Sequence, residues 1–126
     1  MNYLIVEDDP NLRLLWRAVL DDLGHDVREA ATIDAAEAVL ADGTVDVMVL
    51  DLYLGRDNGL SLAAVARDHN PYCHVIIVTG AADICVADLH ARIPALASVH
   101  RKPVDIEDLI ATCARLDCHG DTAARL

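Results

Sequence analysis

The chain has 126 residues, the usual size of one domain, and 54% of them are hydrophobic while only 3% are aromatic, so aliphatic side chains must fill the core. Its 21 acidic residues against 10 Lys and Arg give a net charge of −11, which repels polyanions and argues against direct binding of nucleic acid. No apolar run approaches the roughly 18 to 20 residues that cross a bilayer, and no signal-peptide pattern is present, so we expect a cytoplasmic protein without a membrane partner.

Segments of strand and helix character alternate along the chain. Short apolar runs indicate strands, and apolar residues at helical spacing indicate helices. In chain order the sequence predicts a strand at 2–6, a helix at 10–23, a strand at 26–29, a helix at 33–40, a strand at 45–50, a helix at 60–69, a strand at 74–79, a short helix at 81–91, a strand at 96–100 and a helix at 106–116.

Polar residues and a glycine mark several of the predicted helix ends. Asp9 before Pro10 is typical of an N-cap acid followed by proline at the first helical position. Thr32 and Asp105 stand in the same place before two later helices. Gly24 closes the first helix, because glycine readily adopts the left-handed conformation that ends helices.

The alternation predicts an α/β fold, a doubly wound parallel sheet of five strands with helices on both faces. Right-handed crossover connections between parallel strands allow few other arrangements. The sequence shows no internal repeat and no linker. We therefore expect one domain at 1–117, followed by a flexible C-terminal tail at 118–126.

Acidic and polar residues stand at the carboxyl ends of the predicted strands. Glu7 and Asp8 follow the first strand, Asp51 follows the third, Thr79 ends the fourth and Lys102 follows the fifth. In open α/β sheets the carboxyl ends of the strands meet at one edge, which is where such folds bind ligands. We expect these five side chains to converge there.

Two carboxylates in this position require a positive charge between them. If neighbouring strands bring Asp8 and Asp51 within about 4 Å, the two charges repel by roughly 4 kcal/mol at an effective dielectric constant of about 20. Oxygen ligands at a partly hydrated site favour a divalent cation such as Mg²⁺, which commonly binds one or two carboxylates and keeps several waters. Lys102 adds a second positive charge.

A carboxylate beside a cation is also a possible nucleophile, because aspartyl phosphates are a known class of covalent intermediate. A metal ion and Lys102 would neutralise charge on a phosphoryl group, and the Thr79 hydroxyl would donate a hydrogen bond to one of its oxygens. Each residue alone has a plainer explanation: an aspartate after a strand is more often a turn residue, and Asp9 serves as a helix cap. Their joint placement favours phosphoryl transfer to Asp51.

Five motifs occur in order along the chain, namely LIVEDDP at 4–10, VLDLYL at 49–54, NGL at 58–60, IIVTG at 76–80 and KP at 102–103. In this order and spacing they resemble the response-regulator receiver domain of two-component signalling systems, from Tyr3 to about Leu116. The resemblance implies a flavodoxin-like strand order, 2-1-3-4-5. It also implies that the domain at 1–117 is a receiver domain.

The resemblance makes Asp51 the acceptor of a phosphoryl group from a histidine kinase or a histidine phosphotransfer protein. Thr79 and Lys102 match the family's switch threonine and its lysine, and the peptide bond before Pro103 is commonly cis. The implied Mg²⁺ ligands are Asp8, Glu7, Asp51 and the backbone carbonyl of Tyr53. Such a domain is not an enzyme in the ordinary sense, although it assists its own phosphorylation and dephosphorylation.

Two positions near the fifth strand depart from the family pattern. Val99 stands where the family usually has Tyr or Phe, a residue of its conformational switch. Pro94 and Ala95 replace the usual Ala-Gly pair. We expect an altered coupling between phosphorylation and output.

The leading hypothesis is a phosphoacceptor that signals by a conformational change to a downstream protein or to an output domain outside this chain, with a homodimer as a further option. The alternative is a pseudo-receiver that acts as a protein-interaction module without phosphorylation. A cofactor-binding flavodoxin-like protein or a phosphatase of the haloacid dehalogenase type is disfavoured, because no glycine-rich phosphate loop is present. Modification at Asp51 by an acyl phosphate with Mg²⁺ separates the first two hypotheses.

Overall fold

The computed structural model describes residues 1–54, 57–80 and 85–125, and for 57–58 and 117–125 it describes the backbone only. The elements in chain order are β1 (Asn2–Val6), α1 (Pro10–Asp22), β2 (Asp26–Ala30), α2 (Ile33–Leu40), β3 (Val47–Asp51), β4 (Tyr53–Leu54), β5 (Asp57–Asn58), α3 (Leu60–His69), β6 (His74–Thr79), α4 (Val86–Arg92), β7 (Leu96–Arg101) and α5 (Ile106–Arg125).

Five strands form one parallel sheet in the order β2-β1-β3-β6-β7. Numbered without the small β4–β5 hairpin, this is the order 2-1-3-4-5, so the predicted doubly wound fold is confirmed. The order reverses beside β1, between β1 and β3. The carboxyl ends of these two central strands therefore flank the place where such sheets bind ligands.

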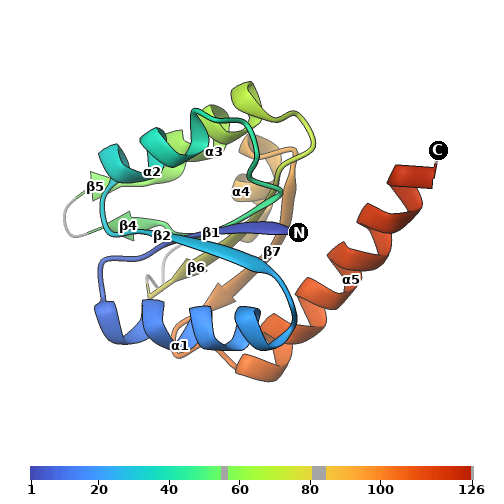
Figure 1. The fold of residues 1–126 in the computed structure, drawn as a ribbon. Coiled ribbons are helices and arrows are strands. Elements are labelled where there is room, and N and C mark those ends of the chain that lie inside the picture. The colour runs from blue at the N-terminus through green and yellow to red at the C-terminus, as the bar shows by residue number, and fades with distance from the viewer. Residues whose placement is uncertain (55–56, 81–84, 126) are drawn as a thin grey trace.

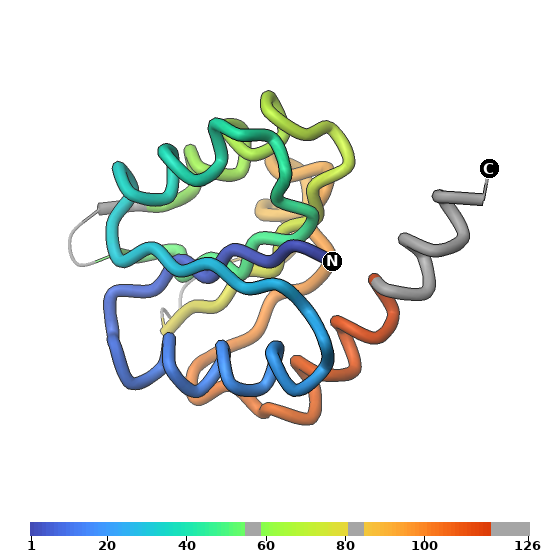
Figure 2. Tube along the Cα trace, viewed as in Figure 1, coloured from blue at the N-terminus to red at the C-terminus, as the bar shows by residue number. Residues whose placement is uncertain are grey.

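Helices cover both faces of the sheet (Figure 1), with α2, α3 and α4 on one side and α1 and α5 on the other. The trace in Figure 2 leaves the face covered by α1 after that helix, runs along the face covered by α2, α3 and α4, and returns to the face of α1 only with α5. Alternate residues of each strand point to opposite faces. Ile77 accordingly packs in the cluster under α2, α3 and α4, and its neighbour Ile76 packs in the cluster under α1 and α5.

The predicted helix starts are confirmed by hydrogen bonds. The Asp9 carboxylate accepts from the backbone N–H of Asn11 at 2.8 Å, and the Thr32 hydroxyl accepts from Ala35 N–H at 3.1 Å. Asp105 likewise accepts from the backbone N–H of Glu107 at 2.9 Å. Each bond satisfies an N–H group that the first turn of a helix leaves without a partner inside the helix.

Several boundaries differ from the prediction. The third strand begins at Val47 and includes Asp51, and two-residue strands β4 and β5 lie between it and the next helix, where the sequence predicts no element. The predicted helix at 81–91 begins outside the described residues, and the structure assigns α4 to Val86–Arg92. The last helix extends to Arg125, past its predicted end near Leu116, and the added segment contains no proline that would end it. The division into a domain at 1–117 and a flexible tail stays a prediction.

Among the described residues, no helix combines the length and the apolar character that a bilayer crossing needs.

Candidate functional site

Backbone pairing at the carboxyl edge of the sheet places the predicted site residues side by side. Strand β1 lies beside β3 with Val6 opposite Leu50, so Glu7 and Asp51 leave adjacent strands at the same level. The backbone N–H of Lys102 donates to the carbonyl of Thr79 at 2.8 Å, which fixes the end of β7 against β6. The predicted convergence at this edge is confirmed for the strand ends.

Three carboxylates form a cluster at this edge. Glu7, Asp8 and Asp51 each offer an oxygen, and these atoms lie within 4.8 Å of one another. Glu7 and Asp51 are buried, with relative exposures of 0% and 3%, whereas Asp8 is exposed. The cluster therefore has two acids in the protein interior and one, Asp8, on the surface.

Lys102 bridges the two buried acids. Its Nζ lies 3.1 Å from Asp51 Oδ2 and 3.1 and 3.2 Å from the two carboxylate oxygens of Glu7. These are charge-assisted hydrogen bonds of normal length. Lys102, which is remote from both acids in the sequence, thus supplies a positive charge between the two buried carboxylates.

Among the described residues, the ammonium group of Lys102 is the one cation in contact with the two buried carboxylates of the cluster. Burial, followed by the neighbouring Asp51, raises the pKa of Glu7 to about 7, and Lys102 offsets only part of this effect. Burial opposes the charged form of Lys102, but its hydrogen bonds with Asp51 and Glu7 outweigh this, so the pKa of the ammonium group is raised. The cluster can accept a further cation, and its hard oxygen donors are those that Mg²⁺ and Ca²⁺ prefer.

The Asp51 carboxylate is oriented by the chain that follows it. The backbone N–H of Tyr53 donates to Asp51 Oδ1 at 3.2 Å, which leaves Oδ2 to Lys102. Gly59 lies directly against this segment: a Cβ there would stand 3.1 Å from Leu50 Cδ1 and 3.2 Å from the Asp51 carbonyl oxygen. The close approach explains the glycine of the NGL motif.

Arg13 supports the acidic turn from α1, and sequence reasoning missed it. Its guanidinium donates to the backbone carbonyls of Glu7 at 2.8 Å and Asp8 at 3.3 Å, and it lies 3.5 Å from a Glu29 carboxylate oxygen. The available signal was an arginine in the first turn of the helix that follows the acids. Its contacts hold the backbone from which both acids project.

The remaining predicted residues are placed as follows. Thr79 ends β6, is buried and lies opposite Arg101 of β7. Val99 packs against the core cluster under α2, α3 and α4, so an aliphatic side chain occupies the position where the family has an aromatic ring. The Lys102–Pro103 peptide bond is cis, as the resemblance implied. The assignment of the Tyr53 carbonyl as a metal ligand stays a prediction.

Curated relatives share the sequence pattern but are much longer. The alginate biosynthesis transcriptional regulatory protein AlgB of Pseudomonas aeruginosa is 40% identical over 76 residues, which cover 60% of this chain and 17% of AlgB. The response regulator protein PilR of the same species is 30% identical over 118 residues, covering 90% of this chain and 26% of PilR. The chain thus spans about a quarter or less of these relatives' length.

Solved structures share the fold. A response regulator protein from Burkholderia pseudomallei, described with a phosphorylated aspartic acid, a calcium ion and citrate, is similar with a TM-score of 0.78 and 29% identity over 88% of this chain and 65% of that chain. A CheY-like receiver domain protein from Methanospirillum hungatei has a TM-score of 0.83 at 24% identity, over 96% and 97% of the two chains. The latter likeness concerns the fold alone.

The family model described as the response regulator receiver domain matches residues 3–114. Except for Asn2 of β1, this range includes all five strands of the sheet, and it includes every residue of the acidic cluster. The chain therefore belongs to the family of response regulator receiver domains.

Proposed function

We propose that this chain is a cytoplasmic signalling module that accepts a phosphoryl group on Asp51 from a histidine kinase or a histidine phosphotransfer protein. The observation that carries the proposal is the contact of Lys102 Nζ with Asp51 Oδ2 at 3.1 Å, within a cluster that also holds Glu7 and Asp8. The Burkholderia protein, which carries a phosphorylated aspartic acid, supports the same chemistry.

The donor set fits a divalent metal ion. Glu7, Asp8 and Asp51 bring three carboxylate oxygens within 4.8 Å, and among the described residues Lys102 is the cation that pairs with the two buried acids, Glu7 and Asp51. We propose Mg²⁺, held by these acids together with the Tyr53 carbonyl. When bound, the ion supplies positive charge to the phosphoryl oxygens.

The chain's own residues provide the nucleophile and part of its surroundings. An Asp51 carboxylate oxygen forms a bond to phosphorus while the bond from phosphorus to the donor's imidazole nitrogen breaks, and that nitrogen keeps the electron pair. The Tyr53 N–H holds the carboxylate plane through Oδ1, which fixes the direction of attack. Lys102 neutralises charge on the phosphoryl group, and the buried Thr79 hydroxyl is proposed to donate to one of its oxygens.

The signal is proposed to reach a downstream protein or an output domain outside this chain through a conformational change. The named relatives AlgB and PilR are regulators several times longer than the matched region, which agrees with output domains in other parts of such proteins. With Val99 in place of an aromatic residue, we propose that the change runs through Thr79 and its loop.

Incubation with Mg²⁺ and acetyl phosphate tests the proposal, with the product followed by intact-protein mass spectrometry. We expect one phosphoryl group per chain, dependent on Mg²⁺ and abolished in Asp51→Asn, because an amide is a far poorer nucleophile. Asp22→Asn, on the solvent side at the end of α1, makes the same chemical change away from the site and should be modified as the wild type is. A folded wild type that takes up no phosphoryl group would instead favour the pseudo-receiver.

A further inference from the structure

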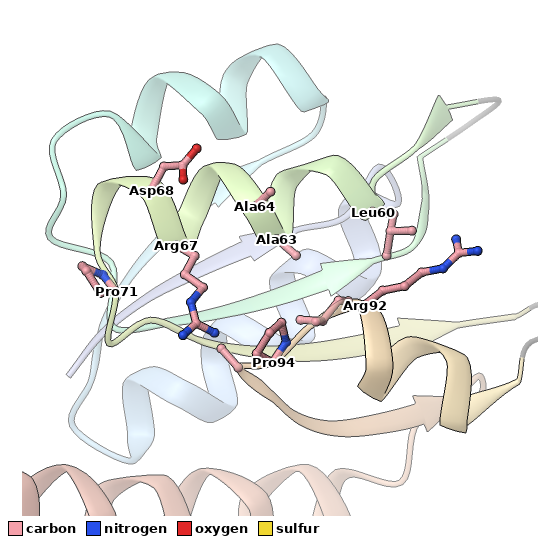
Figure 3. Close-up of a pocket in the computed structure, with 10 residues that line it drawn as sticks. Leu60, Ala63, Ala64, Arg67, Asp68, Pro71, Arg92 and Pro94 are labelled. Carbon is pink, nitrogen blue, oxygen red and sulfur yellow. The ribbon is translucent and has the colours of Figure 1, made fainter.

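A pocket of about 360 Å³ lies between α3 and the connection from α4 to β7, away from the acidic cluster. Figure 3 shows it along one side of α3, with Pro71 near one end and Leu60 near the other. Its volume falls in the lower part of the range that protein binding pockets occupy. The connection that forms one wall carries Pro94 and Ala95, the pair at which the sequence departs from the family pattern.

Small and apolar side chains create this pocket. Helix α3 presents Ala63 and Ala64 to it, and the opposite wall is formed by Ile93 and Pro94. Because two alanines leave only methyl groups on the helix side, the space between the two walls is not filled by the chain itself. An apolar side chain entering there would remove apolar surface from water on both walls.

Two arginines flank the apolar walls. Figure 3 shows Arg67 reaching from α3 toward Pro94, while Arg92 extends past Leu60 at the other end and the Asp68 carboxylate points away from the pocket. Within the described part of the chain, the side chain of neither arginine has an ion pair or a hydrogen bond. In a chain with a net charge of −11, this pocket is a local positive feature. Guanidinium groups are well suited to bind carboxylates.

We propose that this pocket is a docking site for an acidic peptide segment of a protein partner. One large apolar side chain of the segment enters between α3 and Pro94, and carboxylates on either side of it pair with Arg67 and Arg92. The separation of the two cations by apolar walls requires an acidic, apolar, acidic pattern, which a peptide chain supplies more readily than a compact small anion. The docking does not depend on phosphorylation of Asp51.

A titration with the blocked peptide EEFEE, followed by amide chemical shifts of the isotope-labelled chain, tests this inference. We expect shifts confined to α3 and the α4–β7 connection. Arg67→Gln or Arg92→Gln should raise the dissociation constant of the peptide about tenfold, because each substitution removes charge-assisted hydrogen bonds. Ala64→Phe should abolish the shifts by filling the pocket.

The matched control is Arg17→Gln on α1, which removes the same charge from the opposite face of the sheet and should leave the affinity unchanged. Three outcomes would overturn the inference: no shifts in this region, equal binding of the peptide QQFQQ, or equal binding of EEAEE. Phenylacetate that binds more tightly than EEFEE would overturn it as well, by assigning the pocket to small organic anions.

Discussion

Lys102 supplies the positive charge between Glu7 and Asp51, and its removal should separate phosphorylation from metal binding. In Lys102→Ala the carboxylates remain available to Mg²⁺, but the ammonium group that neutralises negative charge on the phosphoryl group is lost. We expect the rate of phosphorylation by acetyl phosphate to fall about a hundredfold, the usual effect of removing one such stabilising group. Mass spectrometry at timed intervals measures the rate, and calorimetric titration measures Mg²⁺ binding.

Arg17→Gln is the control for this substitution, because it removes a cation that pairs with Glu29 and Asp21 on the surface. A phosphorylation rate in Lys102→Ala equal to that of the control would contradict the role assigned to the lysine.

His100 should titrate below its ordinary range. Burial lowers the pKa of this imidazole from 6.5, Asp108 opposes the shift and Arg115 reinforces it. The ring nitrogen Nε2 lies 2.8 Å from the Ser98 hydroxyl, so the half-buried ring is hydrogen-bonded. The unfolded chain then binds the proton more readily than the folded one, and stability is lost as the pH falls through the folded-state pKa.

An NMR titration of the His100 ring measures this pKa directly, with His100→Gln to assign the signal. When the pH is lowered from about 7 to about 5, the melting temperature of this variant should fall less than that of the wild type, because the variant lacks the group that takes up the proton. A midpoint at or above 6.5 in the folded protein would show that the surroundings do not act on the ring in this way.

The individual site residues were predictable from sequence to different degrees. Glu7, Asp51 and Lys102 could be named because each stands at a strand end, and parallel strands bring their carboxyl ends to one edge. Arg13 could not, because its role consists of bonds to backbone carbonyls, and those depend on the path of the chain after β1. Sequence pattern indicates which side chains share an edge, but not which backbone groups need support there.

At the scale of the element, the cap of α1 should contribute measurably to stability. Asp9→Ala removes the carboxylate that accepts from the N–H groups of Asn11 and Leu12 at 2.8 and 3.4 Å. We expect the free energy of unfolding to fall by about 1 kcal/mol, the usual cost of losing an N-cap acid. Urea denaturation followed by circular dichroism provides the measurement.

Asp22→Ala is the corresponding control at the other end of the same helix, where a negative charge is not favoured by the helix dipole. It should be neutral or slightly stabilising. Equal losses in both variants would mean that the Asp9 hydrogen bonds contribute nothing beyond the general effect of removing an acid.

The elements of the sheet were predictable, because periodicity and caps are local signals, whereas their order was implied by the resemblance to the receiver family. The β4–β5 hairpin was not, since its pairs Tyr53 with Asn58 and Leu54 with Asp57 depend on how the chain after Asp51 turns back. The end of α5 at Arg125 was also missed, because a segment without an apolar stripe gives no periodic signal even when its residues are compatible with a helix.

At the scale of the whole molecule, the two faces of the sheet should behave as one cooperative unit. Ile76 and Ile77 are fully buried in the two separate core clusters on opposite faces of β6. Ile76→Ala and Ile77→Ala should each lower the free energy of unfolding by about 2 to 5 kcal/mol. Both variants should still unfold in a single transition, because the same strands contribute side chains to both clusters.

Tryptophan fluorescence and circular dichroism together test this expectation, since Trp16 lies in the cluster under α1 and α5 only. Ile76→Val serves as a mild control, with an expected loss of about 0.5 to 1.5 kcal/mol. Fluorescence and circular dichroism transitions that separate in Ile77→Ala would show that the faces unfold independently.

Asp51 itself is proposed to carry the phosphoryl group. After phosphorylation with acetyl phosphate and Mg²⁺, borohydride reduction converts the acyl phosphate to a stable alcohol, and peptide mass spectrometry locates it. We expect the reduced residue at Asp51 alone, because its carboxylate is held by Lys102 and the Tyr53 N–H. Reduction at Glu7 or Asp8 instead, or at many surface carboxylates with none at Asp51, would contradict the account.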